Sequence, residues 1–504
     1  MITLRGSIAR NTLLNLAGQA APFLVGLIAI PFTVRGLGTD RFGVLGLVWL
    51  VVGYFTLLDL GMGRAATRFA ADAIGRRAYD EIAGITWSAV GVQAIVGVAG
   101  GILAGLLAPV LVQSVLRVPA DLEAEAVTAF RILAIAIPVV LVAASFRGLL
   151  EAARRFDLVN LVSVPGSALN FLVPLIGALL GWGLPPIVAI MVLARGTTLV
   201  AYFLCARHLF PAITQPRRAS LAGARSLLNF GAWVTVSNVV SPVLDQLDRL
   251  LLGAFAGVGS VGFYTPPQEA VLRIRALPTA LAATLFPEFS SQATAAAVDR
   301  ARGYYAIAIR VLALLLAPAT LALVLLGHDF LRLWLGDSFA LTSTTALRML
   351  AMGALVNALA YVPLTFLHGV NRPDLPAKFH AVELPGFLLL AWFLMPRYGV
   401  SGAGIAWATR AGADALLLFL GAAACGAGPS LVRPTRLTWA WILALAAGLV
   451  VAFTPGWAAL NAWLRGGLAI AASALLLLFG WHALLRSEDR ARLRSRLGTL
   501  GGTP

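Results

Sequence analysis

The chain has 504 residues, of which 60% are hydrophobic and 12% charged, and its formal net charge is +16. An average soluble domain carries roughly 25% charged residues, so this chain lacks the polar side chains that a water-facing surface needs. The composition therefore excludes a soluble globular protein and indicates an integral membrane protein.

The positive charge does not indicate a nucleic-acid partner, because that reading needs Lys and Arg clustered on a soluble face. Here the basic residues fall in short gaps between apolar stretches, as in cytoplasmic membrane loops. Cys205 and Cys425 lie at predicted cytoplasmic helix ends, so no disulfide is expected. The sequence has no glycine-rich phosphate loop and no His/Cys cluster with metal-ligand spacing. We therefore expect no cofactor, no metal and no enzymatic activity.

Apolar stretches of about 20 residues, the length that crosses a bilayer, follow one another from the amino terminus onward. The first is too long for a signal-peptide core, and we interpret it as a retained helix. About 14 transmembrane helices are predicted. Their expected ranges are 11–34, 42–63, 83–110, 128–149, 158–180, 185–206, 226–254, 262–288, 304–326, 345–367, 379–396, 401–424, 438–454 and 466–485.

The distribution of positive charge predicts the orientation of these helices. With the amino terminus in the cytoplasm, the inner segments hold 24 of the 38 Lys and Arg residues and the outer segments hold 6. We therefore expect a multi-pass protein of the bacterial inner membrane with both termini in the cytoplasm. No loop is long enough to contain a soluble domain.

The two halves of the chain repeat one another. Arg35 matches Arg249 at an offset of 214, and Arg195 matches Arg410 at an offset of 215. Because the repeat contains six helices, both copies have the same orientation and should enclose a cavity between two lobes. The expected fold is all-α, with two six-helix lobes and two further helices. The predicted domains are 1–210, 221–425, 438–485 for the two further helices, and a basic cytoplasmic tail at 486–504.

Ionisable residues inside a membrane are costly and tend to face a cavity or a partner. The predicted seventh helix carries Asn238, Asp245, Asp248 and Arg249. Asp245 and Arg249 are four residues apart and can pair, which leaves Asp248 to find a partner elsewhere. Arg249 lies about 30 Å along the helix, at its outer end. An interfacial salt bridge and a direct substrate contact both remain open for this set.

The predicted eighth helix carries Glu269, Arg273 and Arg275. Glu269 and Arg273 are again four residues apart, and both arginines lie roughly 17–20 Å from the helix start, near the middle of the bilayer. Two residues apart on a helix, the arginines should face different surroundings. We expect Arg273 to face the cavity; the alternative is an intrahelical pair together with one snorkelling side chain.

Four further charged residues are candidates for gating or structural roles. Arg195 and Arg410 occupy equivalent places in the sixth and twelfth helices, which favours a shared role such as capping or a loop contact. Arg35 ends the first helix. Asp59 precedes Arg64 near the inner end of the second helix, where a helix-end salt bridge is expected.

The histidines at inner membrane ends, His368, His380 and His482, are expected to be solvated or interfacial. The groups nearest mid-membrane are mainly cationic, and an Arg-lined cavity recruits an anion, with bidentate geometry that suits phosphate. A cation exporter would instead need unpaired carboxylates there.

Several motifs resemble the oligosaccharide flippase branch of the multidrug/oligosaccharidyl-lipid/polysaccharide exporter superfamily. The resemblance covers most of residues 1–425, and the motifs are largely structural. They are Leu37-Gly38-Thr39-Asp40-Arg41-Phe42-Gly43, Leu57-Leu58-Asp59-Leu60-Gly61, Asp248-Arg249-Leu250-Leu251-Leu252-Gly253, Gly259-Ser260-Val261-Gly262-Phe263-Tyr264 and Gly399-Val400-Ser401-Gly402.

This resemblance implies a monomeric transporter whose two lobes rock between inward-open and outward-open states. Its partners would be membrane lipids and a lipid-linked oligosaccharide on a polyprenyl diphosphate, carried to the outer leaflet for polysaccharide export. In related lipid II flippases, arginines of helices 1 and 2 are proposed to hold the diphosphate. Helix 1 has none before Arg35 here, so only the eighth helix plausibly takes that role. Two alternatives stay open: a drug or cation antiporter, and a membrane glycan polymerase or polyprenyl-linked glycosyltransferase.

Overall fold

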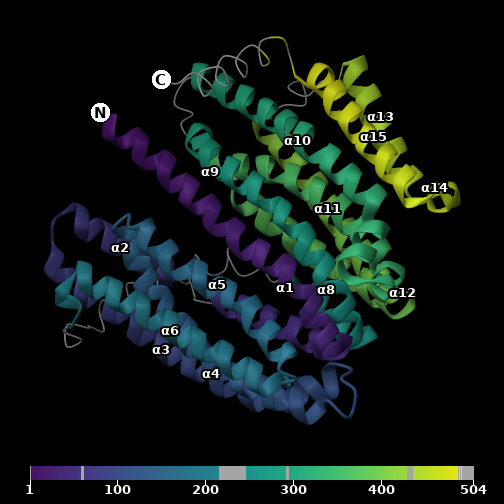
Figure 1. Ribbon diagram of the computed structural model, residues 1–504. Helices are drawn as coiled ribbons and strands as arrows, with labels where there is room; N and C mark the ends of the chain where they lie inside the picture. Colours follow the sequence, from purple (N-terminus) through teal and green to yellow (C-terminus); the bar gives the residue numbers. More distant parts are fainter. Residues whose placement is uncertain are drawn as a thin grey trace, which may run out of the picture. The chain divides into compact units, whose positions relative to one another are not determined.

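The computed structural model describes residues 2–57, 62–214, 246–290, 295–427 and 435–485, with Ser487 and Arg490. All regular structure in these ranges is helical, as expected from the composition (Figure 1). Eight of the described helices are long and apolar enough to cross a membrane. The all-α membrane fold is thereby confirmed, while the number of 14 helices stays a prediction.

The chain folds as two compact units, Met1–Thr265 and Pro266–Pro504. The predicted lobe boundary at 210–221 falls beside a stretch outside the described residues. The first unit contains α1 (Ile2–Leu57), α2 (Met62–Gly75), α3 (Tyr79–Val110), η1 (Leu111–Val115), α4 (Glu123–Ala152), α5 (Phe156–Leu179), α6 (Leu184–Leu209), η2 (Pro211–Thr214), a helical stretch at 246–256 and the first half of α8 (Val258–Leu272).

The second unit begins within α8. It contains η4 (Arg273–Arg275), α9 (Ala276–Ser290), α10 (Ala295–Leu335), α11 (Asp337–Gly369), α12 (Asp374–Ala422), η5 (Ala423–Ala427), α13 (Arg436–Val451), α14 (Pro455–Ala459) and α15 (Ala462–Ala483). The predicted span 262–288 is interrupted, because the 3₁₀ turn η4 separates α8 from α9 at the two arginines.

Glycines interrupt the helical path of two of the long helices. Gly399 in α12 has φ 52° and ψ −125°, and Gly38 in α1 has φ 77° and ψ 167°, conformations that side chains with a Cβ rarely adopt. In a straight helix Phe379 and Gly421 would lie about 63 Å apart. A Cβ placed on Gly421 would instead lie 3.0 Å from the Phe379 ring. α12 is therefore two antiparallel arms that meet at Gly399, where the sequence predicts a break between two spans.

Close packing of α11 against α12 uses small residues. A Cβ on Gly353 of α11 would lie 2.9 Å from the Ala408 Cα, and a Cβ on Gly404 of α12 would lie 2.8 Å from the Ala346 Cα. Helices in lipid associate through such small-residue contacts, because burial of apolar surface gives little driving force there. This contact positions the polar side chains of α12 described below.

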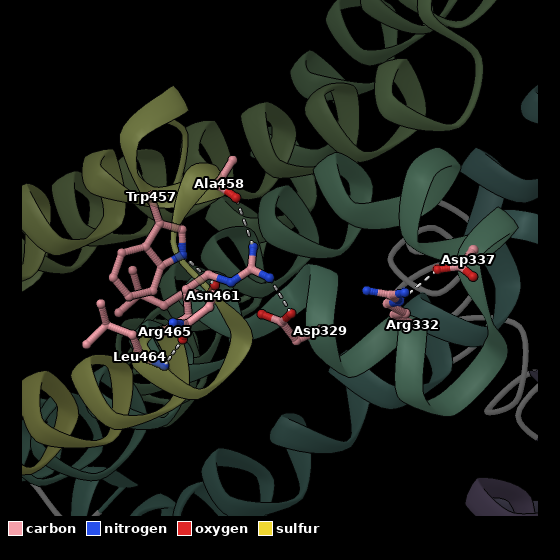
Figure 2. Close-up of polar contacts among 9 residues, drawn as sticks. Asp329, Arg332, Asp337, Trp457, Ala458, Asn461, Leu464 and Arg465 are labelled. Carbon is pink, nitrogen blue, oxygen red and sulfur yellow. Dashed lines mark hydrogen bonds and ion pairs between the residues drawn. The ribbon is translucent and has the colours of Figure 1, made fainter.

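The segment α13–α15 is attached to α10 by polar contacts. The Trp457 indole N–H donates to the Leu325 carbonyl oxygen at 2.9 Å, and Arg465 Nη2 lies 2.7 Å from Asp329 Oδ1 (Figure 2). The side chain of Asn461 accepts from the Leu464 amide and caps the start of α15. In an apolar environment these contacts fix the α13–α15 segment beside α10, as Figure 1 also shows.

Candidate functional site

In the first unit, Asp248 and Arg249 are both buried. The Tyr264 hydroxyl donates to Asp248 Oδ2 at 2.6 Å, and the Arg249 amide donates to Asp248 Oδ1 at 2.9 Å. The partner that the sequence leaves open for Asp248 is therefore a tyrosine of α8. This bond ties α8 to the preceding helical stretch. The substrate role of Asp248 and Arg249 stays a prediction, and Asn238 and Asp245 lie outside the described residues.

The gating and structural candidates of the first unit lie in different surroundings. Arg195 of α6 donates from Nη2 to Asn170 Oδ1 of α5 at 2.9 Å. This is a contact between neighbouring helices, neither the cap nor the loop contact that its position suggested. Arg35 is exposed on α1. Asp59 lies outside the described residues.

In the second unit, the two arginines of η4 have different neighbours. Arg273 Nη2 lies 3.3 Å from Glu269 Oε2, and both side chains are partly exposed. The Arg275 guanidinium carbon lies 5.8 Å from the centre of the buried Trp407 ring, a cation–π arrangement. A 3₁₀ turn places residues two apart at roughly 240° around its axis, which separates the two guanidiniums. Their role in substrate binding stays a prediction.

Arg410 belongs to a buried polar cluster that links the two arms of α12. Its Nη1 lies 3.8 Å from Glu383 Oε2. His380 Nδ1 lies 3.7 Å from that same oxygen and 3.7 Å from Asp414 Oδ1. We call His380, Glu383, Arg410 and Asp414 the α12 cluster. Their side chains are between 3% and 11% exposed.

The α12 cluster contradicts the prediction for His380 and contains two acidic residues that were not predicted. His380 was expected to be solvated or interfacial, but the antiparallel arms of α12 bury it beside two carboxylates. Glu383 and Asp414 were not among the site residues predicted from the sequence. The signal was present: both are acids inside predicted spans, at spacings of three residues from His380 and four from Arg410. Each pair alone suggests a local contact, and only the reversal at Gly399 joins them.

One atom each from His380, Glu383 and Asp414 lies within 4.8 Å of the others, which is the arrangement of a small cation site. Among the described residues, neither carboxylate oxygen of Glu383 receives a hydrogen bond. Buried acceptors without a donor are costly, so this set is poised to take up a positive charge.

The sequence is similar to proteins named for polysaccharide biosynthesis and O-antigen transport. A family model described as "Polysaccharide biosynthesis protein" matches residues 8–292. A Shigella flexneri protein named as an O-antigen transporter is 28% identical over 419 residues, which cover 82% of this chain and 97% of that protein. The Escherichia coli lipopolysaccharide biosynthesis protein WzxC is 23% identical, over 71% of this chain and 69% of its own length.

Solved structures share the fold. The lipid II flippase MurJ in an inward closed conformation has a TM-score of 0.72 at 13% identity, covering 94% of this chain and 100% of that one. An inward-facing multidrug resistance transporter of the MATE family has a TM-score of 0.68 at 18% identity, covering 83% of this chain and 99% of that one. At these identities the likeness concerns the fold alone.

Proposed function

Because the chain belongs to the polysaccharide biosynthesis protein family, we propose that it is a flippase that moves a lipid-linked oligosaccharide across a membrane. The observation that carries this proposal is the match of the family model to residues 8–292, more than half of the chain. Similarity over nearly the full length of a protein named as an O-antigen transporter supports it. So does similarity to two Haloferax volcanii proteins named as flippases, each over more than a third of this chain.

The finer parts of the proposal rest on the distribution of charge. The carrier would be a polyprenyl diphosphate, because Arg273 and Arg275 offer guanidinium groups at a break between two apolar helices, and guanidinium suits phosphate oxygens. Of the two, Arg273 is the more exposed and is the first candidate to contact the diphosphate. Arg249 is a second candidate. The excess of basic residues in alternate loops supports a bacterial inner-membrane location with both termini in the cytoplasm.

The transport cycle would be alternating access between an inward-open and an outward-open state. The chain would act as a monomer, without cofactor or nucleic acid, and would transport its substrate without altering it. In this cycle the diphosphate is attracted by the arginines from the cytoplasmic leaflet and released at the outer leaflet. The apolar helices keep the polar glycan away from lipid during the passage.

The test of the function is the leaflet in which lipid-linked glycan accumulates when cells lack this protein. A flippase predicts accumulation on the cytoplasmic leaflet, with the outer leaflet depleted. Unpolymerised units on the outer leaflet would instead indicate a polymerase, and normal glycan distribution with altered drug resistance would indicate an antiporter. Either result would contradict the proposal.

The test of the site is the substitution Arg273→Ala in cells that depend on this chain. Loss of the positive charge should abolish or strongly reduce glycan export, while Arg273→Lys should retain part of it, because a Lys keeps the charge without the bidentate geometry. Arg332→Ala is a matched control, since Arg332 is an exposed arginine of the same unit that pairs with Asp337 at the end of α10. Full export in Arg273→Ala would overturn the assignment of this residue.

A further inference from the structure

The α12 cluster is assembled from both arms of one helix. His380 and Glu383 lie on the arm before Gly399, and Arg410 and Asp414 lie on the arm after it. In a straight helix His380 and Asp414 would be about 51 Å apart. The reversal at Gly399 brings their side chains to 3.7 Å. Four ionisable side chains thus meet in the interior of a membrane-spanning hairpin, where each costs several kcal/mol unless its charge is compensated.

Formal charge in the cluster does not balance when His380 is neutral. Glu383 and Asp414 contribute two negative charges, and the Arg410 guanidinium contributes one positive charge. Arg410 Nη1 lies 3.8 Å from Glu383 Oε2, and Asp414 Oδ1 lies 3.7 Å from the His380 imidazole. A buried site with an uncompensated charge is unfavourable. One additional unit of positive charge makes this cluster neutral.

The position of the imidazole favours a proton as that charge. His380 Nδ1 lies 3.7 Å from an oxygen of each carboxylate, so it stands between two acceptors. A neutral imidazole has one N–H donor, whereas the protonated ring has two. Protonation at this position therefore supplies both the missing charge and a donor directed at the carboxylates. Small side-chain movements would shorten 3.7 Å to a hydrogen bond.

Metal ions fit the cluster less well. A divalent ion would leave the site with a net positive charge, because the Arg410 guanidinium already lies 3.8 Å from the Glu383 oxygen. A hard monovalent ion such as Na⁺ prefers oxygen ligands, and a third of this ligand set is an imidazole nitrogen. A proton satisfies the charge balance and uses the imidazole in its ordinary chemistry.

Among the described residues, α11 brings a second histidine to the surroundings of the cluster. α11 packs along α12, and the imidazole of His368 at its last turn interacts electrostatically with His380. The charged side chains Asp337 and Arg348 of α11 contact α10 instead, through Arg332 and the Val324 carbonyl. His368, which is exposed at the Gly369 end of α11, is therefore one group through which a proton could reach the cluster.

We propose that His380, Glu383, Asp414 and Arg410 form a site that binds one proton within the second unit. Binding adds the proton to the His380 imidazole and takes the cluster from a net charge of −1 to neutral. The proton is the coupling ion of transport; this last step rests on the proposed flippase function, whereas proton binding itself does not. In the first unit the equivalent arginine, Arg195, contacts the neutral amide of Asn170, so no such site is expected around Arg195.

Infrared difference spectroscopy on the purified full-length protein in lipid nanodiscs tests the site without any substrate. The buffer is exchanged between about pH 5 and about pH 8, the range in which histidine changes charge. Wild-type protein should show bands of a histidine that changes protonation and of a perturbed buried carboxylate. A parallel pH-stat titration should show additional uptake of about one proton per chain relative to His380→Gln. Replacing Na⁺ by K⁺ at constant pH should leave the spectrum unchanged.

Variants assign the bands to the cluster. His380→Gln, Glu383→Gln and Asp414→Asn should each remove or shift the coupled carboxylate signal. Asp374→Asn is the matched control, because Asp374 is an exposed acid of the same helix that pairs with Arg372 and Lys378. Asp414→Glu should retain a shifted signal. His368→Gln should slow proton uptake but preserve its extent.

Three results would overturn the proposal. The first is a wild-type protein in which no band of a buried carboxylate depends on pH. The second is a carboxylate signal that responds to Na⁺ at constant pH, which would assign a metal ion to the cluster. The third is an unchanged signal in the variants of the cluster. The wild-type measurements test proton binding even if a variant fails to fold. A protein that binds the proton but does not flip glycan would contradict the proposed function and leave the proton site standing.

Discussion

The two units differ in how a buried carboxylate is compensated. In the first unit Asp248 receives hydrogen bonds from the Tyr264 hydroxyl and a backbone amide, both of them fixed donors. In the second unit Glu383 receives no hydrogen bond among the described residues and is compensated by Arg410 at 3.8 Å. Both oxygens of Asp248 receive a hydrogen bond, whereas among the described residues both oxygens of Glu383 keep their capacity to accept one. The first arrangement is suited to a structural role and the second to binding a mobile charge.

The equivalent arginines show the same contrast. Arg195 of α6 contacts one neutral amide, Asn170, at 2.9 Å. Arg410 of α12 lies with two carboxylates and an imidazole. The repeat predicted from the sequence would thus have kept a cation at one place in both halves and changed the side chains around it. The difference concerns net charge more than geometry, and it can be tested by substitutions.

The largest expected effect is that of Arg410→Gln. Its removal leaves Glu383 and Asp414 buried without the guanidinium, and breaking a buried ion pair from one side costs about 3–5 kcal/mol. Arg195→Gln should cost clearly less, because the partner left behind is a neutral amide. The measurement is the unfolding free energy of each purified variant in the same detergent. Equal losses of unfolding free energy in the two variants would show that the surroundings of Arg195 and Arg410 do not differ in net charge.

A double-mutant cycle sharpens this first prediction. If the cost of Arg410→Gln comes from uncompensated negative charge, Glu383→Gln in the same chain should recover part of it, with a coupling energy of about 0.5–3 kcal/mol. A coupling energy of zero would mean that the loss comes from packing around the Phe387 ring, which the Arg410 guanidinium also faces.

Tyr264→Phe should have the next largest effect. It removes a hydroxyl that donates to a buried carboxylate at 2.6 Å, and a hydrogen bond to a charged group contributes about 1.5–3 kcal/mol. Tyr202→Phe is the matched control in the same unit, because its hydroxyl contacts a neutral carbonyl at 3.5 Å. Thermal unfolding of the two variants should separate them. Indistinguishable midpoints would show that the Tyr264 bond does not hold Asp248.

The smallest effect is expected for Asn170→Ala. The partly buried Arg195 guanidinium loses one hydrogen bond to a neutral amide, which is worth about 1 kcal/mol. The same unfolding assay measures it. A loss of unfolding free energy as large as that of Arg410→Gln would mean that the first unit depends on Arg195 as strongly as the second depends on Arg410.

Much of the fold could be predicted from the sequence, because the length and apolar character of each span are set by the bilayer. The break between the predicted spans 379–396 and 401–424 coincides with the reversal at Gly399. The interruption at Arg273–Arg275 could not be predicted from hydropathy. Hydropathy averages over about 19 residues, and a 3₁₀ turn of three residues leaves no trace in it.

The candidate site was predicted only in part. Arg195 and Arg410 were found through the repeat, which compares a residue with its counterpart and gives no information on its spatial neighbours. Glu383 and Asp414 are 31 residues apart in sequence. Their proximity depends on the arms of α12 folding back in one particular register, which is decided by side-chain packing and cannot be derived from periodicity.

The most direct test of the flippase function is a transport assay with purified protein in liposomes that contain a polyprenyl-diphosphate-linked oligosaccharide on both leaflets. A glycosidase added outside digests only the glycan of the outer leaflet. With active protein, glycan from the inner leaflet should also become accessible, so digestion should go to near completion. Digestion that stops at the outer-leaflet fraction, with or without a pH gradient, would contradict the account.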